Sequence, residues 1–261
     1  MLTVPIDPVL FSIGSLEIRY YGLVYVLGFL LILYALNKAR KKGVLEIKEG
    51  KEYDLVFYLM LGTILGSRLF HVIGNFSFYL NNPLKMFYLW QGGMAFHGGL
   101  IGILIAAYLF SKKNNINFLR LADVLTIPAI FVLALGRIMN FINQELIGTL
   151  TDVPWCFNFR NYEGCRHPVQ LYGAFGRFFL FFFLLKLSRK YKDGFVFWIF
   201  VLLMGVGRFF VDFLREDPRL LGLSFGQGFS LVMILIGGYV LFRSYREDLK
   251  NLFSKKEKSN D

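Results

Sequence analysis

Residues 136–148 concentrate polar side chains at the end of a segment that is otherwise apolar. They read GRIMNFINQELIG, and Arg137, Asn140 and Gln144 recur at intervals of three and four, so they share one face of a helix. An ionisable residue at membrane depth is costly to bury and therefore indicates a functional site. Pairing within a helix bundle is the structural alternative. With an arginine at its centre, the set favours the binding of an anion.

A second stretch, residues 205–217, repeats this pattern as GVGRFFVDFLRED. Arg208, Asp212 and Arg215 are spaced four and three apart on one helical face, so Asp212 can accept hydrogen bonds from either arginine. A self-contained ladder of ion pairs is one interpretation. Two arginines beside a single carboxylate nevertheless leave a net positive face, which suits a phosphate.

Three further positions have side chains suited to acid–base or polar chemistry. His97 stands in MAFHGGLIG beside Gly98 and Gly99. An imidazole takes up a proton near neutral pH and glycines allow close approach of a ligand, although a lone histidine is usually a core residue. His167 opens HPVQLYG at a helix entry, and Tyr21 in RYYGLVY lies where an interfacial aromatic anchor is expected. The three histidines stand far apart in the sequence, so we expect no metal site.

Long apolar segments must position these side chains. Hydrophobic residues make up 56% of the 261 and charged residues 18%, whereas a soluble domain has roughly 25% charge. A transmembrane helix needs about 20 mostly apolar residues. The segments that meet this need are 20–37, 54–73, 94–110, 121–142, 170–187, 194–214 and 225–242. The sequence therefore predicts an all-α, multi-pass membrane protein with about seven transmembrane helices. We expect one domain over residues 1–261, with small outer excursions at 74–93 and 143–169.

The distribution of basic residues predicts the orientation of these helices. With seven spans, alternate loops share a side of the membrane. Nineteen of the 29 Lys and Arg residues fall on the side of the 38–52 loop and the C-terminal tail, and six on the other side. Because basic loops stay in the cytoplasm, we expect the N-terminus outside and the C-terminus inside. The net charge of +11 then reflects topology and attraction to anionic lipid, and gives no argument for nucleic acid.

Cys156 and Cys165 are the only cysteines of the sequence, and both fall in the 143–169 loop. An oxidising compartment outside the membrane would allow a disulfide between them. Two unpaired thiols are an equally open interpretation, because a spacing of nine positions carries little information. We expect neither cysteine to be a nucleophile.

The 136–148 stretch resembles the signature of the phosphatidylglycerol:prolipoprotein diacylglyceryl transferase family. The positions that match that signature are Gly136, Arg137, Asn140, Phe141, Asn143, Glu145 and Gly148. Further matches are DPVLFSIG at 7–14, RYYGL at 19–23, FHGG at 96–99, HPVQLY at 167–172 and GRFFVDFLRED at 207–217. The resemblance spans nearly the whole chain. It implies a seven-helix, multi-pass protein of the bacterial cytoplasmic (inner) membrane with its N-terminus outside.

The resemblance implies transfer of the diacylglyceryl group of phosphatidylglycerol to the lipobox cysteine of a prolipoprotein signal peptide. A thioether forms and glycerol phosphate is released. The nucleophile then belongs to the substrate, so the chain needs no cysteine or serine of its own at the site. We expect no cofactor, and as partners phosphatidylglycerol, the prolipoprotein and the lipid bilayer, without nucleic acid. The thiol, whose pKa is ordinarily about 8.5, must lose its proton, and the phosphate charge must be stabilised.

The same resemblance suggests roles for individual residues. We expect Arg137 and Arg208 to clamp the lipid phosphate and His97 to be the base, although a thiol beside a positive cluster could also ionise without one. The residues expected at the headgroup, besides Arg137, are Tyr21, Gly98, Asn140, Asn143 and Gly148. The residues expected to contact these groups and hold them in orientation, without binding the substrate themselves, are Glu145, His167, Gln170, Tyr172, Asp212 and Arg215.

The sequence departs from the family pattern at three positions. The family tends to have a small residue at Met139 and a glutamate at the positions of Asp212 and Gly173. Asp212 keeps the charge on a shorter side chain, whereas Gly173 removes a carboxylate, so we expect no acid there. Met139 bears on how closely the 121–142 helix packs.

Other classes of membrane protein fit the sequence less well. An anion transporter or channel would more often show inverted repeats or matched broken helices. An intramembrane serine protease would need a partner for Ser67, and a retinal-type receptor would need a lysine in 225–242; neither is evident in the sequence. A purely structural assembly protein would leave the polar residues of 136–148 and 205–217 without a role.

Overall fold

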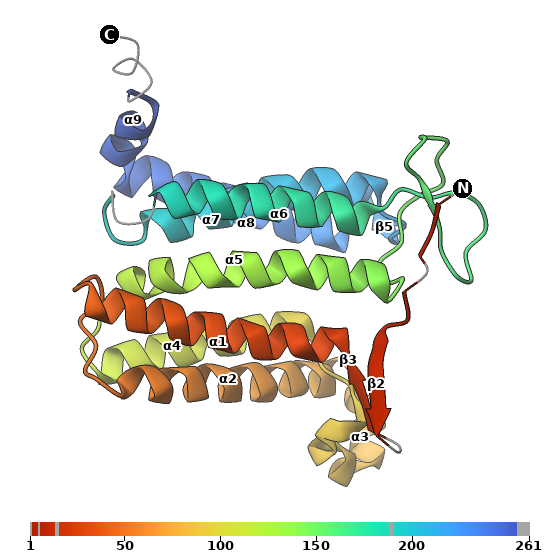
Figure 1. The fold of residues 1–261 in the computed structure, drawn as a ribbon, viewed down its shortest axis with the longest axis horizontal. Helices are drawn as coiled ribbons and strands as arrows, with labels where there is room; N and C mark the ends of the chain where they lie inside the picture. Colours follow the sequence, from red (N-terminus) through yellow and green to blue (C-terminus); the bar gives the residue numbers. More distant parts are fainter. Residues whose placement is uncertain (1, 5, 14–15, 188–190, 255–261) are drawn as a thin grey trace. The chain divides into compact units, whose positions relative to one another are not determined.

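The computed structural model describes residues 2–4, 6–13, 16–187 and 191–254, most of them helical (Figure 1). The α-helices are α1 (Tyr20–Lys41), α2 (Lys51–Gly74), α3 (Phe76–Asn81), α4 (Phe96–Lys113), α5 (Phe118–Ile142), α6 (Val169–Leu187), α7 (Phe195–Val211), α8 (Phe225–Ser244) and α9 (Arg246–Ser254). Short 3-10 helices are η1 (Pro83–Phe87), η2 (Leu89–Gln91) and η3 (Asp212–Leu214). The strands are β1 (Leu2–Thr3), β2 (Val9–Ile13), β3 (Leu16–Arg19), β4 (Phe157–Asn158), β5 (Arg219–Leu220) and β6 (Leu223–Ser224). Gly14 of the 7–14 match and five of the basic residues on the expected cytoplasmic side lie outside the described residues: Arg189, Lys190, Lys255, Lys256 and Lys258.

Within the described residues, six helices are long and apolar enough to cross a membrane. They are α1, α2, α5, α6, α7 continued through η3, and α8. The prediction of a helical multi-pass membrane protein is therefore confirmed. The 94–110 segment, expected as a further span, forms the 18-residue α4, which is not among these six.

The chain divides into two compact units, one of Met1–Gly28 with Leu125–Asp261 and one of Phe29–Val124. We call them the discontinuous unit and the central unit. The central unit is continuous in sequence, and α1 and α5 each pass from one unit into the other.

Glycines bring α2 and α4 of the central unit into backbone contact. Gly62 and Gly66 of α2 face Gly102 and Gly98 of α4, each pair spaced by four residues. A Cβ atom at any of the four would run into a carbonyl oxygen of the facing helix. Small residues at this spacing are the usual means of helix association in lipid, where packing rather than hydrophobic burial holds helices together.

Arg68 of α2 holds part of the 74–93 segment, which follows this helix, through hydrogen bonds. Its side chain is only 7% exposed and donates hydrogen bonds to five backbone carbonyls of the 83–93 segment. The acceptors are the carbonyl oxygens of Lys85, Met86, Tyr88, Gly92 and Gly93. One arginine within a predicted span thus has a structural role, because it satisfies loop carbonyls that regular structure leaves unpaired.

In the discontinuous unit, α6, α7 and α8 pack around an apolar cluster. Its buried members are Ile130, Leu180, Leu184, Leu187, Phe195, Val196, Ile199, Leu241 and Tyr245. Gly205 of α7 lies against the backbone of Ser230, and Gly237 of α8 lies against the backbone of Leu202. Close helix packing therefore fixes the geometry of the side chains that α7 presents.

Short strand pairs accompany the helices of the discontinuous unit. β1 pairs in parallel with β4, whereas β2 pairs antiparallel with β3 and β5 with β6. Ser224 then begins α8 with a capping box, since its hydroxyl accepts from the backbone N–H of Gln227 while the Gln227 side chain accepts from the Ser224 N–H.

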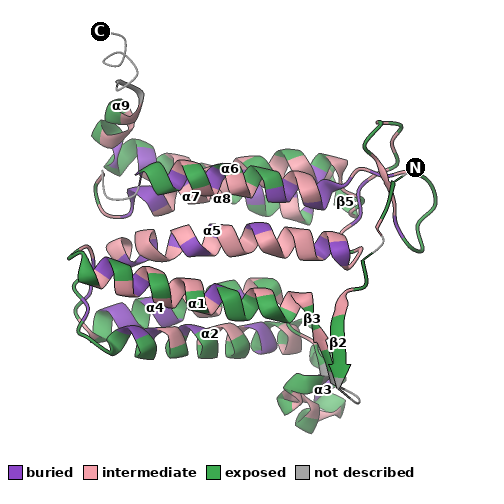
Figure 2. Ribbon diagram, in the orientation of Figure 1, coloured by how far each residue is buried: buried purple, intermediate pink, exposed green. Residues whose placement is uncertain are grey.

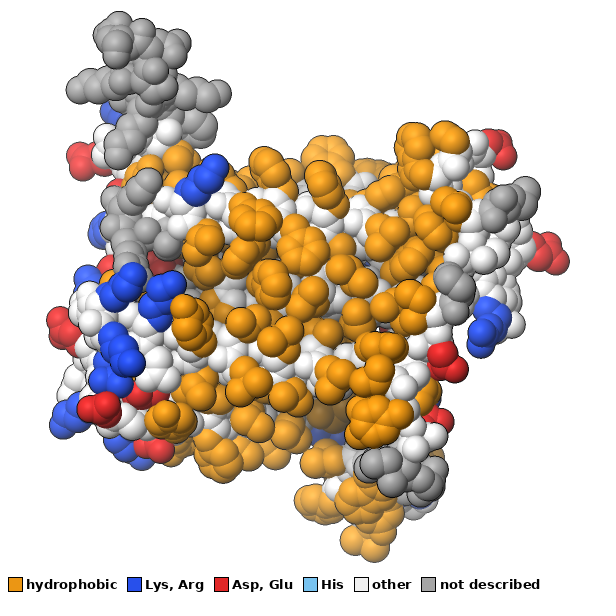
Figure 3. Space-filling view, viewed as in Figure 1, with side chains coloured by type: hydrophobic (Ala, Val, Ile, Leu, Met, Phe, Trp, Pro, Cys, Tyr) orange, Lys and Arg blue, Asp and Glu red, His pale blue; other side chains and the backbone are white. Residues whose placement is uncertain are grey.

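The surface of the helices suits a lipid environment. In the most apolar stretch of α1, and likewise of α2, only 17% of the residues are buried within the structure. Figure 2 shows exposed positions recurring along both helices. Hydrophobic side chains cover the visible flanks of the helices, and Lys and Arg side chains gather where α1 runs into α2 (Figure 3). Exposed apolar area of this extent requires apolar surroundings.

Candidate functional site

A cavity of about 430 Å³ opens between α5, α6 and α7 of the discontinuous unit. Arg137, Arg208 and Arg215 line it together with apolar residues such as Leu180 and Phe183. Positive side chains and apolar walls in one cavity match the two parts of a phospholipid, the anionic headgroup and the hydrocarbon chains.

Arg137 lies in the last two turns of α5, and its side chain lines the cavity. The ionisable groups close enough to influence it electrostatically include Arg177, Arg208, Arg215, Asp212 and Tyr21. Among the described residues, none is hydrogen-bonded to its guanidinium or forms an ion pair with it. The guanidinium donors are therefore available to an anion in the cavity.

Arg208 and Asp212 form an ion pair one helical turn apart, with 3.4 Å between Arg208 Nε and Asp212 Oδ2. Asp212 is buried, at 4% exposure. Gly226, in the first turn of α8, lies directly against this pair, because a Cβ there would meet the Asp212 carboxylate and the Arg208 guanidinium. The capping box at Ser224 fixes the start of α8 and so places Gly226. Gly226 has no signal in the sequence, since only its tertiary contacts distinguish it from other helix glycines.

The end of α7 is joined to the loop that follows α5. Thr149 N–H donates to the Leu214 carbonyl at 2.8 Å, and Glu216 N–H donates to the Ile147 carbonyl at 3.1 Å. Arg215, between these two contacts, forms an ion pair with Asp217 at 3.1 Å. These backbone bonds hold Arg215 at the cavity.

Gly148 belongs to this junction. It pairs with Arg215 in a β-bridge, and a Cβ at Gly148 would meet the carbonyl oxygen of His167. The close backbone contact accounts for the glycine, and its expected contact with a headgroup stays a prediction.

Glu145 gathers the amide side chains at the end of α5. Its carboxylate accepts from Asn140 Nδ2 at 3.1 Å and from Asn143 Nδ2 at 3.2 Å. Gln170, which is almost fully buried, donates to the Glu145 backbone carbonyl at 2.6 Å. The structure thus brings together four residues predicted from the sequence, and the contacts suit the orienting role expected of Glu145 and Gln170.

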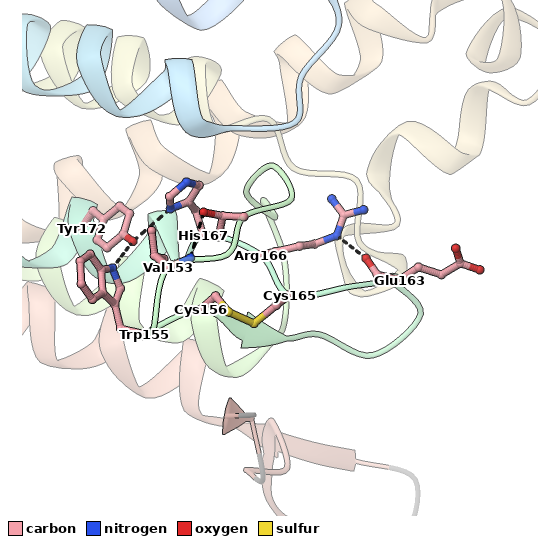
Figure 4. The surroundings of a disulfide bond; sticks show 9 residues. Val153, Trp155, Cys156, Glu163, Cys165, Arg166, His167 and Tyr172 are labelled. Atoms are coloured by element: carbon pink, nitrogen blue, oxygen red, sulfur yellow. Dashed lines mark hydrogen bonds between the residues drawn. A yellow bond between two sulfur atoms is a disulfide. The ribbon is translucent and has the colours of Figure 1, made fainter.

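The 143–169 loop contains a disulfide between Cys156 and Cys165, whose Cα atoms are 5.5 Å apart (Figure 4). Of the two interpretations open from the sequence, the structure has the disulfide. Figure 4 also shows Tyr172 between Trp155 and His167. The Tyr172 hydroxyl accepts from Trp155 Nε1 at 2.8 Å and lies 3.2 Å from His167 Nδ1. The loop therefore supports the start of α6, where Tyr172 lines the cavity.

Arg166, next to the disulfide, connects the loop to the site. It is 7% exposed, donates to the Gly148 carbonyl at 3.1 Å and forms an ion pair with Glu216. Arg166 thereby links the two backbone segments that meet at Arg215, which are the loop after α5 and the segment after α7.

Arg177 also lines the cavity, although no motif in the sequence indicates a role for it. It lies in α6, and its guanidinium enters the same cavity as Arg137 and Arg208. The available signal was an arginine in the middle of a predicted span, combined with the missing side chain at Gly173.

His97 and Gly98 lie at the start of α4, in the central unit. His97 is half-buried and contacts the ring of Phe96 edge-on at 5.7 Å between centroids. Gly98 is buried against Gly66 and Phe70, a contact that helix packing explains. Tyr21, at the start of α1, packs against Tyr25 at 5.4 Å between centroids. The roles expected of His97, Gly98 and Tyr21 stay predictions.

A family model described as prolipoprotein diacylglyceryl transferase matches residues 8–243 of this chain. The chain belongs to the prolipoprotein diacylglyceryl transferase family. Three relatives carry the name phosphatidylglycerol–prolipoprotein diacylglyceryl transferase. The one from Geobacter sulfurreducens is 43% identical over 241 residues, 89% of this chain and 93% of the relative. The one from Vibrio cholerae is 40% identical over 253 residues (94% and 93%), and the one from Aliivibrio salmonicida 40% over 269 residues (97% and 95%).

Membership of the prolipoprotein diacylglyceryl transferase family covers both compact units, because the matched residues run through the central unit and most of the discontinuous one. The matched residues therefore include those that line the arginine cavity and those of α4, which begins at Phe96.

Proposed function

We propose that this chain transfers the diacylglyceryl group of phosphatidylglycerol to the thiol of the lipobox cysteine of a prolipoprotein. Its family and the names of its relatives support this activity. The assignment of the site rests on the cavity, in which Arg137 and Arg208 lie beside apolar walls. The cavity belongs to a membrane protein of this family. The lipid phosphate would bind these arginines, and its acyl chains would lie along the apolar residues.

In the proposed reaction the cysteine sulfur attacks a carbon of the diacylated glycerol, the one that is bonded to the phosphate oxygen. A carbon–sulfur bond forms, the carbon–oxygen bond to phosphate breaks, and its electron pair stays on the departing glycerol phosphate. Arg137 and Arg208 stabilise the charge on that phosphate, and His97 accepts the thiol proton. Tyr21, Asn140, Asn143, Gly98 and Gly148 orient the headgroup. Glu145, Asp212, Arg215, His167, Gln170 and Tyr172 hold these groups in place.

We further propose that the chain works as one domain with seven crossings of the bacterial cytoplasmic membrane, α4 being the seventh. The basic residues in the last turns of α1, α4, α6 and α8 support this topology. It leaves the N-terminus and the disulfide loop outside, where a disulfide is chemically favoured, and the C-terminus in the cytoplasm.

A direct test measures the mass of a lipobox peptide after incubation with the purified protein and phosphatidylglycerol. We expect a gain of one diacylglyceryl group with the wild type and no gain with Arg137→Ala. Arg243→Ala, in the last turn of α8, is the matched control and should be fully active. An inactive wild type would refute the proposed activity, and an active Arg137→Ala would refute the proposed clamp.

A further inference from the structure

Arg177 is a half-buried cation that, among the described residues, has no partner of opposite charge. It is the ninth of the 19 residues of α6, which places it near the middle of a membrane-crossing helix. Its Nη1 donates to the Gly173 carbonyl at 2.8 Å, and its buried Nε has no hydrogen-bond partner. Within the described residues, no carboxylate lies at ion-pair distance. Such a group costs stability, so its presence points to a ligand.

Gly173 makes room for this guanidinium. A Cβ atom at position 173 would lie 2.9 Å from Arg177 Nη1 and 3.7 Å from Arg137 Cδ. Arg177 and Arg137 therefore lie against the same glycine from different helices. A side chain at position 173 would require the Arg177 guanidinium to shift from its present position.

The charges around the cavity exceed those needed for the intact lipid. Arg137, Arg177 and Arg208 lie close enough to interact electrostatically with one another, and the carboxylate of Asp212 also lies close to them. Arg215 has its own partner in Asp217. Three guanidinium groups beside one carboxylate leave two positive charges without compensation, whereas the phosphodiester of phosphatidylglycerol has one negative charge.

The leaving group supplies the second negative charge. Glycerol phosphate is a phosphate monoester, which has about −1.5 to −2 charges at pH 7. The additional charge develops on the phosphate oxygen as its bond to the glycerol carbon breaks. The three arginines thus match the charge of the transition state and product better than that of the substrate, as catalysis requires.

We propose that Arg177 is a further catalytic residue, which contacts the phosphate and stabilises the second negative charge as the carbon–oxygen bond breaks. This inference rests on the proposed function of the cavity. The sulfur–carbon bond forms as the carbon–oxygen bond breaks, and the electron pair remains on the phosphate oxygen beside Arg177. The thiol proton leaves separately, so Arg177 remains protonated throughout.

The test compares Arg177→Met and Arg177→Lys with the wild type in the lipobox-peptide assay, measuring kcat and KM for phosphatidylglycerol. Loss of one donor to a developing oxyanion lowers kcat by about 10²-fold, so we expect a loss of that order for Arg177→Met with KM within about twofold. Arg177→Lys should recover part of kcat because it keeps the charge. Inhibition by free glycerol phosphate should weaken in Arg177→Met more than inhibition by a glycerol phosphodiester.

Thermal denaturation separates this role from a structural one. Replacing an unpaired, half-buried cation by an apolar side chain of similar length should leave the denaturation midpoint unchanged or raise it. A lower midpoint with a parallel loss of activity would overturn the proposal, as would an unchanged kcat or a loss confined to KM. If the wild type is active and Arg137→Ala is inactive while Arg177→Met is fully active, only this inference fails. An inactive wild type would instead refute the proposed function.

Discussion

Gly226 controls the orientation of Arg208 through the space that it leaves. The Asp212 carboxylate and the Arg208 guanidinium occupy positions that a side chain at Gly226 would need. An added methyl group at position 226 would therefore require the Asp212 carboxylate or the Arg208 guanidinium to shift. The position of Arg208 on α7, which we propose binds the lipid phosphate, therefore depends on a glycine of α8.

We predict that Gly226→Ala lowers kcat by about 10- to 100-fold, since a displacement of about 1 Å at a reacting group can cost 10²-fold. Gly228→Ala is the matched control, because nothing lies within 4 Å of a Cβ at that position. The measurement is the initial rate of lipobox-peptide modification by both variants. Equal rates would show that the Arg208–Asp212 pair does not need the space at Gly226.

Helical spacing was sufficient to predict part of the site. Arg208 and Asp212 were placed on one face from their separation of four, and the structure has them as an ion pair. Glu145 and Asn140 were predicted together from one motif and are hydrogen-bonded. Arg177 was not predicted, because its role depends on residues of two other helices, and no local pattern brings them together.

The contact between α2 and α4 relies on glycine on both helices, and α4 begins beside His97. A single methyl group at this contact would meet backbone atoms, which cannot rotate away as a side chain can. The distance between the two helices is thus set by the absence of side chains.

We predict that Gly66→Ala destabilises the protein by about 1–3 kcal/mol, the usual cost of overpacking. Gly74→Ala at the end of the same helix is the control, since a Cβ there meets nothing within 4 Å and alanine favours a helix. Thermal denaturation should show a lower midpoint for Gly66→Ala only. A midpoint equal to that of the Gly74→Ala control would mean that the two helices can separate without cost.

The disulfide closes a short loop whose neighbour Arg166 holds Gly148 and Glu216. We predict that reduction lowers the stability of the 143–169 loop by about 2–3 kcal/mol, from the entropy of a loop of this length. A reductant should lower the midpoint of wild-type denaturation and the transferase rate together. The Cys156→Ser, Cys165→Ser double variant should behave like the reduced wild type and be insensitive to the reductant; a double variant as stable as the oxidised protein would contradict the prediction.

Periodicity and hydropathy predicted the helices well and the excursion after α2 poorly. The expected spans 170–187 and 225–242 correspond to α6 (Val169–Leu187) and α8 (Phe225–Ser244). The 74–93 segment contains α3, η1 and η2, which the sequence did not indicate. Its conformation depends on the carbonyl contacts with Arg68, and such contacts have no signature in the segment itself.

The number of crossings decides on which side each loop lies. If α4 crosses, the loop between α4 and α5 is cytoplasmic; if it does not, that loop shares the side of the excursion after α2. α4 is less apolar than a membrane span of its length usually is, because His97, Lys112 and Lys113 lie within its 18 residues.

We predict that a reporter fused after Asn115 is cytoplasmic. Alkaline phosphatase, which needs an oxidising compartment, should be inactive at this position, and a fluorescent protein that folds in the cytoplasm should be bright. Fusions after Asn82, in the excursion, should show the opposite pair of results. Active phosphatase after Asn115 would refute the seventh crossing.

The pairing of β1 with β4 joins Leu2 to Phe157 in a parallel register. Because β1 precedes these helices in the chain and β4 follows them, β1 has no strand partner until α1, α2, α4 and α5 have all been synthesised. The central unit, continuous in the chain, can complete its helix contacts during this interval. The arginine cavity, whose walls come from α5, α6 and α7, is thus among the last parts of the protein to form during synthesis.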